Sequence, residues 1–213
     1  MKVLIACEYS GVVRDAFIKQ GHEAISCDLL PSESDVGEHY QGDVTDILND
    51  GWDMMIAHPP CTYLSVSGAR WYYHPEDKHL PYEERRPHPM HPNRRQLQQE
   101  ALDFVQLLLD APIHKIVVEN PISVISSKIK KPTQIIQPYE YGHPTSKSTC
   151  LWLKNLQPLQ PTNVVKPIWI NVSKGKRMSK FHYDTYTLPK KERGKIRSAT
   201  FPGIAKAMAE QWG

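Results

Sequence analysis

The sequence predicts an α/β protein with a mostly parallel sheet covered by helices on both faces. Short, uninterrupted apolar runs recur along the first 154 residues, and segments with apolar residues at helical spacing lie between several of them. Uninterrupted apolar strands are typical of parallel sheets that are buried on both faces, and alternating strands and helices are typical of doubly wound folds. With 213 residues, the chain is long enough for one such domain.

The N-terminal segment predicts a strand, a helix and a second strand. Residues 2–7 (KVLIAC) form the first apolar run, Gly11 marks a turn, and a helix ended by Gly21 follows. A second strand at 23–27 ends at Asp28. This layout is typical of sites for adenosine-containing cofactors, in which an acidic residue accepts hydrogen bonds from the ribose hydroxyls. Because the turn holds one glycine, it lacks the full dinucleotide-binding pattern.

The rest of the chain predicts three more strands and two more helices. The strands are expected at 52–57, 114–118 and 150–154, and the helices at 93–109 and from Phe201 onward. Ligands of such sheets bind at the carboxyl ends of the parallel strands. We therefore expect the polar residues that directly follow these strands to line one edge of the sheet.

Cys61 is the candidate nucleophile among four cysteines that form no CxxC pair. It follows Pro59 and Pro60 at a predicted strand end, and proline fixes the backbone that aims the thiol. Glu119 follows the next strand, where a carboxylate facing the same edge can hold or donate a proton. A chance turn at Cys61 and a helix-capping role for Glu119 stay open on these residues alone.

In their order along the chain, these segments resemble the DNA cytosine-5 methyltransferase family. Residues 7–11 stand where the family has its cofactor loop, and Gly42-Asp43-Val44-Thr45 is similar to the segment whose aspartate contacts the adenine. Pro59-Pro60-Cys61 resembles the nucleophile loop, and Glu119-Asn120-Pro121 resembles the family's Glu-Asn-Val motif. Residues 141–144 (YGHP) are similar to a segment that precedes a buried strand.

The resemblance implies a Rossmann-like fold of the S-adenosyl-L-methionine-dependent methyltransferases and methyl transfer to carbon 5 of cytosine in DNA. The base would be flipped out of a duplex or lie in a single strand. The implied catalytic residues are Cys61, Glu119, Asn120 and Pro60. The implied cofactor-binding residues are Glu8, Ser10, Gly11, Asp28, Asp43 and Pro59.

Several positions depart from the family pattern. Thr145, Lys147 and Thr149 stand where the family has a glutamine and two arginines, and His58 stands where many relatives have Phe or Gly. Lysine can keep a phosphate contact but lacks the bidentate reach of arginine. Residues 155–200 are too few for a full target-recognition domain, as in the small, phage-type members of the family.

We expect three regions. Residues 1–154 are the catalytic and cofactor-binding core, residues 155–200 are a reduced target-recognition or nucleic-acid-binding region, and residues 201–213 are a helix returning to the core. The net charge is only +3, but basic residues such as Lys174 and Lys176 outnumber acidic ones after residue 160. A basic C-terminal third favours nucleic acid as the partner, although a solvated basic surface is equally consistent with charge alone.

Residues 70–95 are rich in Arg, His, Pro and Tyr, and we expect them to form a mobile lid over the cysteine. The histidines have no familiar metal-binding spacing, so no metal is expected. Residues expected to contact nucleic acid are Ser65, Arg70, Arg94, Arg95, Lys147, Lys176 and Arg177.

Two alternatives remain at this point. One is methylation of cytosine in RNA or in a free nucleotide, which the short C-terminal region favours somewhat. The other is a catalytically inactive nucleic-acid-binding module on the same fold, against which the presence of both Cys61 and Glu119 argues. No apolar run approaches the roughly 20 residues that span a membrane, and the N-terminal run is interpreted as a strand, so we expect a cytoplasmic protein.

Overall fold

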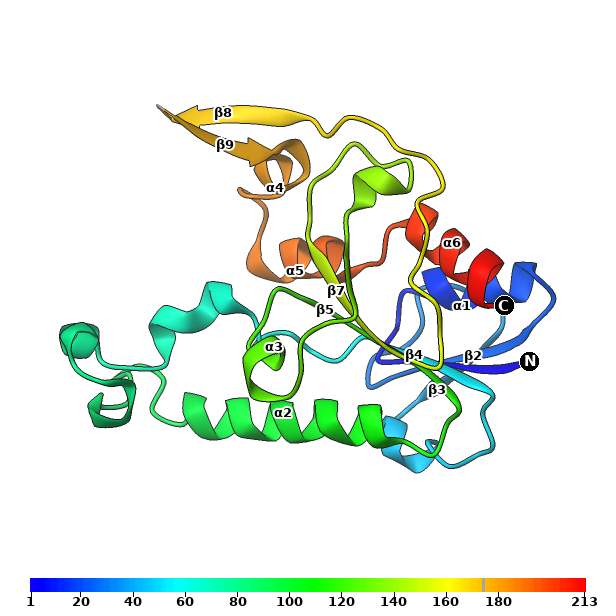
Figure 1. Ribbon diagram of the computed structural model, residues 1–213, viewed down its shortest axis with the longest axis horizontal. Coiled ribbons are helices and arrows are strands. Elements are labelled where there is room, and N and C mark those ends of the chain that lie inside the picture. The colour runs from blue at the N-terminus through cyan, green and yellow to red at the C-terminus, as the bar shows by residue number, and fades with distance from the viewer. Residues whose placement is uncertain (174) are drawn as a thin grey trace.

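The computed structural model describes residues 1–173 and 175–213, which form a seven-stranded sheet with helices on both faces and a separate two-stranded hairpin (Figure 1). Lys174 lies outside the described residues. The strands of the sheet are β1 (Lys2–Ala6), β2 (Glu23–Asp28), β3 (Glu38–Gln41), β4 (Met54–Ala57), β5 (Lys115–Pro121), β6 (Gln134–Ile136) and β7 (Thr149–Lys154). The hairpin consists of β8 (Trp169–Ser173) and β9 (Lys176–Ser179). The α-helices are α1 (Val12–Lys19), α2 (Arg94–Asp110), α3 (Ile125–Lys128), α4 (Lys180–Asp184), α5 (Lys190–Ser198) and α6 (Pro202–Trp212).

The strand order is β3-β2-β1-β4-β5-β7-β6, and it confirms the predicted Rossmann-like fold with a mostly parallel sheet. Strands β3, β2, β1, β4 and β5 pair in parallel, whereas β7 runs antiparallel to both β5 and β6. Every residue of β4 is buried, as is expected of a central parallel strand. The carboxyl ends of the five parallel strands therefore meet at one edge of the sheet.

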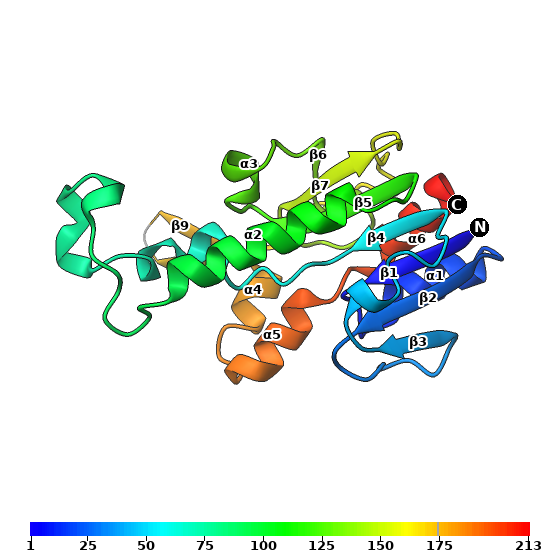
Figure 2. The same cartoon turned by 90° about the horizontal axis from the view of Figure 1, so that it is seen from below.

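The core has two layers, one on each face of the sheet. Helices α1 and α6 lie side by side on one face, and α2 crosses the other (Figures 1 and 2). Successive residues of β1 alternate between the layers: Val3 and Ile5 pack toward α1 and α6, and Leu4 and Ala6 pack toward α2. This arrangement follows from strand geometry, because neighbouring side chains point to opposite faces.

The segment from 155 to 165 lies against the core, although the sequence predicts that it belongs to the nucleic-acid-binding region at residues 155–200. Leu159 is fully buried. The hydroxyl of Tyr141 donates to the Leu159 carbonyl, and the indole of Trp212 donates to the Gln157 carbonyl. The part that projects beyond the sheet is therefore shorter than residues 155–200 and consists of the β8–β9 hairpin with α4 and α5. Among the helices that the structure describes, none has the length and apolar character needed to cross a membrane.

Candidate active site

The residues singled out in the sequence gather at the carboxyl edge of the sheet. Cys7 follows β1, Asp28 ends β2, and Asp43 follows β3. Cys61 follows β4 by a short loop, and Glu119 lies near the end of β5. The parallel pairing of β2, β1, β4 and β5 thus brings together residues that are far apart in the sequence.

The loop that carries Cys61 is held firmly while the thiol itself stays exposed. The Cys61 carbonyl accepts hydrogen bonds from the backbone N–H groups of Leu64 and Ser65. Beyond the cysteine, Val66 N–H donates to the Ile122 carbonyl and Val124 N–H donates to the Leu64 carbonyl, so this loop is joined to the loop after β5. The cysteine is therefore presented to solvent on a fixed backbone.

Glu119 is held by His58, the residue directly after β4. The register Ala57↔Val118 places the next residues on the two strands, His58 and Glu119, side by side. His58 Nδ1 lies 2.8 Å from Glu119 Oε2, and both side chains are nearly buried, at 12% and 13% exposure. Burial disfavours the carboxylate, but the hydrogen bond and charge of His58 outweigh it and hold the Glu119 pKa below its usual value.

The pKa of the Cys61 thiol is shifted in the opposite direction. Desolvation by the surrounding protein atoms, followed by the negative charge of Glu119, raises its pKa above the usual value for a cysteine. The positive charge of Lys147 acts in the other direction. In the free protein the thiol form is therefore favoured at neutral pH, and the nucleophile has to be activated when the substrate is in place.

Asn120 positions the loop of Cys61. Its side chain is buried, and Nδ2 donates to the Pro59 carbonyl at 2.9 Å. The resemblance implies that Asn120 positions Glu119, but in the structure His58 does so and Asn120 fixes the two prolines before the cysteine. Pro59 is buried, whereas Pro60 is exposed and lines a cavity beside the cysteine loop.

Two cavities lie at this edge of the sheet, and Cys7 lines both. The first, here called the Asp28 cavity, has a volume of about 400 Å³ and is lined by Asp28, Asp43, Pro60 and Phe104, among others. The second, the Ser10 cavity, has about 360 Å³ and is lined by Glu8, Ser10, His58, Ser198 and Thr200, among others. Both volumes lie in the range of small-molecule sites.

The two aspartates that line the Asp28 cavity, Asp28 and Asp43, each accept local hydrogen bonds. Asp28 Oδ1 accepts the N–H of Leu30, and Asp43 Oδ1 accepts both the N–H and the hydroxyl of Thr45. These hydrogen bonds lower the pKa of Asp43, so its carboxylate is ionised. Each aspartate keeps a second oxygen for which the structure gives no hydrogen bond within the described residues.

Glu8 and Gly11 shape the start of α1. The buried Glu8 carboxylate accepts hydrogen bonds from the N–H groups of Val13 and Arg14 and from the Ser10 hydroxyl. It therefore caps the helix, which has no cap from its own N-terminal residue, Gly11. Gly11 has φ +75°, and a Cβ there would lie 2.8 Å from Cβ of Ser34. Gly11 does not line either cavity among the described residues.

Lys147 lies inside the site and is only half-exposed. Its Nζ donates to the Arg197 carbonyl at 2.7 Å and stands over the Phe201 ring. Its charge also lowers the pKa of Glu119 and Cys61, after the larger causes named above. Lys147 thus ties the C-terminal segment to the site. A phosphate contact from this residue stays a prediction.

The segment from 62 to 93 projects from the sheet (Figure 1) and contains most of residues 70–95, the region expected to form a lid, but it has an internal structure of its own. It contains three short 3₁₀ helices: Val66–Trp71, Pro75–His79 and Tyr82–Glu84. Arg86 pairs with the buried Asp77 carboxylate, and this hydrogen bonding strongly lowers the Asp77 pKa. The lid is therefore a folded insertion. Within the described residues, no three His, Cys, Asp or Glu side chains are grouped as metal ligands.

The arginines expected to contact nucleic acid at the lid have intramolecular partners. Arg94 donates to the Thr62 carbonyl and stacks on Tyr63 and Tyr72. Arg95 donates to the carbonyls of Tyr72 and Arg85, whereas Arg70 is exposed and stacks on Trp71. The hydroxyl of Ser65 bonds to that of Ser67.

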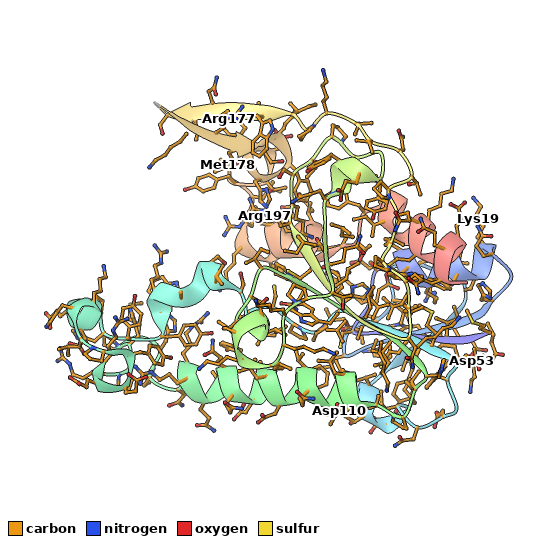
Figure 3. The ribbon with its side chains drawn as sticks, viewed as in Figure 1. Lys19, Asp53, Asp110, Arg177, Met178 and Arg197 are labelled. Atoms are coloured by element: carbon orange, nitrogen blue, oxygen red, sulfur yellow. The ribbon has the colours of Figure 1, made fainter. Side chains whose placement is uncertain are left out.

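The hairpin carries the other predicted nucleic-acid contacts. Lys176 and Arg177 are exposed on β9, and Arg177 stacks on Trp169 of β8. Figure 3 shows Arg177 well away from the sheet, with Arg197 between the hairpin and the core. The hairpin and the lid project from the same end of the molecule, beyond the carboxyl ends of the strands (Figures 1 and 2).

The sequence does not predict two groups of residues that the structure places at the candidate site. In the sequence, His58 stands out only as a departure from the family pattern. The signal that pairs it with Glu119 is that these two residues directly follow the predicted strands 52–57 and 114–118, which are neighbours in the sheet. Residues 195, 196 and 198–200 lie in the region assigned to target recognition, yet they line the Ser10 cavity, where Lys195 pairs with Glu33 at 2.5 Å. No periodic pattern in this polar segment indicates such a contact.

Comparisons with known proteins give fold similarity alone. No protein-family model and no curated protein matches the chain. A triple mutant of Spodoptera frugiperda DNMT2 matches with a TM-score of 0.39 and 15% identity, over 81% of this chain and 61% of that one. WbdD, solved with a kinase inhibitor, matches with a TM-score of 0.39 and 13% identity, over 92% of this chain and 47% of that one. This chain thus spans less than two thirds of either protein, and the fold assignment rests on the strand order.

Proposed function

We propose that this protein transfers a methyl group from S-adenosylmethionine to carbon 5 of a cytosine in DNA, through a covalent adduct with Cys61. The observation that carries the proposal is the pairing of an exposed thiol at the end of β4 with an ionised carboxylate, Glu119, at the end of β5. Cys61 directly follows Pro60, which lines the Asp28 cavity, and Glu119 is bonded to His58, which lines the Ser10 cavity. The resemblance of the motifs implies the same chemistry.

The chemistry of the cavities fits the cofactor. Carboxylates such as Asp28 and Asp43 suit ribose hydroxyls and an adenine amino group, and Phe104 and Pro60 offer apolar surface to the base. The Ser10 cavity suits the polar amino-acid end, because Ser10 and Thr200 line it together with His58, whose buried Nε2 has no hydrogen-bond partner in the described residues. When bound, the cofactor supplies an electrophilic methyl group.

The residues of the chain activate the cytosine. The Cys61 thiolate adds to carbon 6 of the ring, which makes carbon 5 nucleophilic. Ring nitrogen 3 takes up a proton from solvent as the thiolate adds, and the Glu119 carboxylate accepts the hydrogen bond of the resulting N3–H, which draws electrons away from the attacked bond. After methylation, removal of the proton on carbon 5 expels the thiolate. Asn120 keeps the cysteine loop in place throughout.

The target cytosine has to leave the duplex before Cys61 can reach it. A base inside a helix is out of reach of Cys61, so the target is flipped out or single-stranded, at a cost of a few kcal/mol. The hairpin that carries Lys176 and Arg177, and the segment that carries the exposed Arg70, project at the end of the molecule where the parallel strands end (Figure 1). We assign these three residues to phosphate contacts.

The first experiment measures methyl transfer from labelled S-adenosylmethionine to duplex DNA, single-stranded DNA, RNA and dCMP. Label on DNA, mapped to 5-methylcytosine and absent with Cys61→Ala, supports the proposal. Label on RNA or dCMP alone supports the corresponding alternative substrate. DNA containing 5-fluorocytosine adds a second readout, because an active enzyme is trapped on it as a covalent complex. Cofactor binding without transfer to any acceptor contradicts the proposal and favours an inactive binding module.

A further inference from the structure

His58 stands between the two parts of the candidate site. It lines the Ser10 cavity, and it also holds Glu119, which lies outside the lining of that cavity. We propose that His58 is a positioning residue that links the cofactor to Glu119. Its Nδ1–H orients the Glu119 carboxylate, and its Nε2–H binds the carboxylate at the amino-acid end of the cofactor. This inference rests on the proposed function and adds a residue to it.

The hydrogen bond to Glu119 fixes the proton on one side of the ring. An ionised carboxylate only accepts hydrogen bonds, so the 2.8 Å contact requires a proton on His58 Nδ1. The backbone N–H of His58 is also bound, to the Ala6 carbonyl. Both strands therefore hold the ring in place, β1 through the backbone and β5 through the side chain.

The other nitrogen has no partner in the described residues. Nε2 of His58 is enclosed by protein atoms and makes no hydrogen bond. Buried polar atoms are normally paired, and an orphan of this kind at a cavity is expected to receive its partner from a ligand. The nearby Glu8 carboxylate does not fill this role, because it accepts hydrogen bonds from the N-terminus of α1.

The charges around His58 favour its protonated form. Burial disfavours the imidazolium, but the hydrogen bond and charge of Glu119 outweigh it, and Glu8 adds to the effect. Lys147 acts in the opposite direction as the smallest cause. The result is a pKa above the usual value for histidine. An imidazolium donates from both nitrogens, so the partner that suits Nε2 is an anion.

The amino-acid end of S-adenosylmethionine provides such an anion. A carboxylate in the Ser10 cavity and the Glu119 carboxylate would then share one imidazolium, each on its own nitrogen. Binding of the cofactor strengthens the charge on His58, and this in turn steadies Glu119 in the orientation that meets the base. A phenylalanine at position 58, as in many members of the resembling family, cannot make either contact.

Two substitutions test the roles of the two nitrogens of His58 separately. The amide of asparagine takes the place of Nδ1, so His58→Asn keeps a donor to Glu119 and loses the donor at Nε2. The longer glutamine takes the place of Nε2, so His58→Gln has the opposite effect. Binding is measured by calorimetry with S-adenosylhomocysteine, which has the carboxylate, and with methylthioadenosine, which lacks the whole amino-acid end.

We expect His58→Asn to weaken binding of S-adenosylhomocysteine by about 10- to 100-fold, the usual effect of losing a charge-assisted hydrogen bond. Its affinity for methylthioadenosine should equal that of the unchanged protein. His58→Gln should keep most of the affinity for S-adenosylhomocysteine while the rate of methyl transfer falls with little change in KM for DNA. In the unchanged protein, NMR should show the His58 pKa rising with S-adenosylhomocysteine but not with methylthioadenosine.

Two results overturn the inference. Equal affinity of His58→Asn and the unchanged protein for S-adenosylhomocysteine shows that Nε2 has no role in binding. Parallel losses for both ligands show that His58 only supports the structure. These binding results are independent of the proposed function, which instead fails if the unchanged protein binds S-adenosylhomocysteine but methylates no nucleic acid.

Discussion

At the scale of single residues, the reactivity of Cys61 depends on opposing effects of its surroundings. Desolvation and the charge of Glu119 raise its pKa, and Lys147 lowers it. Because the thiolate is the nucleophile, the rate of any reaction at Cys61 increases with pH up to the thiol pKa. Lys147 therefore has a measurable electrostatic role at a position where the resembling family has arginine.

We predict that Lys147→Met makes Cys61 less reactive at neutral pH. Loss of the positive charge raises the thiol pKa further, so the midpoint of the alkylation rate against pH moves to higher pH. The measurement is iodoacetamide labelling of the Cys61 peptide, followed by mass spectrometry. Lys147→Arg, which keeps the charge, is the control and should behave as the unchanged protein. A midpoint that does not move with Lys147→Met contradicts the prediction.

The aspartates of the Asp28 cavity give a second prediction at this scale. Asp43→Ala should weaken binding of S-adenosylhomocysteine about tenfold, because a hydrogen bond to a charged group is lost in a partly enclosed site. Calorimetry measures the effect. Asp46→Ala is the matched control, since Asp46 ends the short 3₁₀ helix Val44–Asp46 that Asp43 caps but does not line the cavity. Equal losses for the two variants would mean that the effect comes from the helix and not from contact with the cofactor.

At the scale of elements, the loop between β1 and α1 depends on a carboxylate that caps a helix. Glu8 is buried and accepts the N–H groups of Val13 and Arg14, which are otherwise left without acceptors at the start of α1. We predict that Glu8→Ala lowers the free energy of unfolding by about 2 kcal/mol. Glu8→Gln keeps an oxygen acceptor and should lose less. Urea denaturation distinguishes them, and equal stability of Glu8→Ala and the unchanged protein would exclude the capping role.

The strands that were predicted from sequence are the buried ones. Residues 2–7, 52–57 and 114–118 are continuous apolar runs because parallel strands in the middle of a sheet are covered on both faces. Strand β3, with sequence EHYQ, lies at an edge and is largely exposed, and β6 has only three residues. Neither requires an apolar pattern. The polar helix α5 has no buried residue, and Ile196 is its single apolar side chain, so its sequence has no apolar stripe that would predict packing on the core.

The sequence predicts which residues belong to the candidate site, but it predicts fewer of the contacts between them. A motif gives the position of Cys61 and Glu119, whereas the partner of each depends on which strands are neighbours. The hydrogen bond between His58 and Glu119 joins residues 61 positions apart and follows from the register of β4 and β5. The use of Lys147 and residues 195–200 at the site depends on how the C-terminal segment returns, which no local pattern in the sequence specifies.

At the scale of the whole molecule, exposed basic residues lie at both ends of its long axis. The hairpin with Lys176 and Arg177 projects at one end, and α1 and α6, with Lys19 and Lys206, lie near the other (Figures 1 and 3). All four side chains are exposed, so simple net charge does not distinguish the two ends. If the hairpin contacts DNA, the two ends differ in how their lysines and arginines affect the salt dependence of binding.

We predict that Lys176→Ala/Arg177→Ala reduces the slope of log K against log salt for DNA binding by about two, because each phosphate contact contributes roughly 0.9 to that slope. Binding should weaken for all DNA sequences alike, since phosphate contacts carry no sequence information. Lys19→Ala/Lys206→Ala removes the same charge from the opposite end and should leave the slope unchanged. Fluorescence anisotropy over a series of salt concentrations measures both variants. If the two pairs lower the slope equally, DNA responds to the net charge of the protein and the hairpin has no specific place in the complex. A slope that falls only for the hairpin pair orients the DNA across the edge of the sheet where Cys61 is exposed.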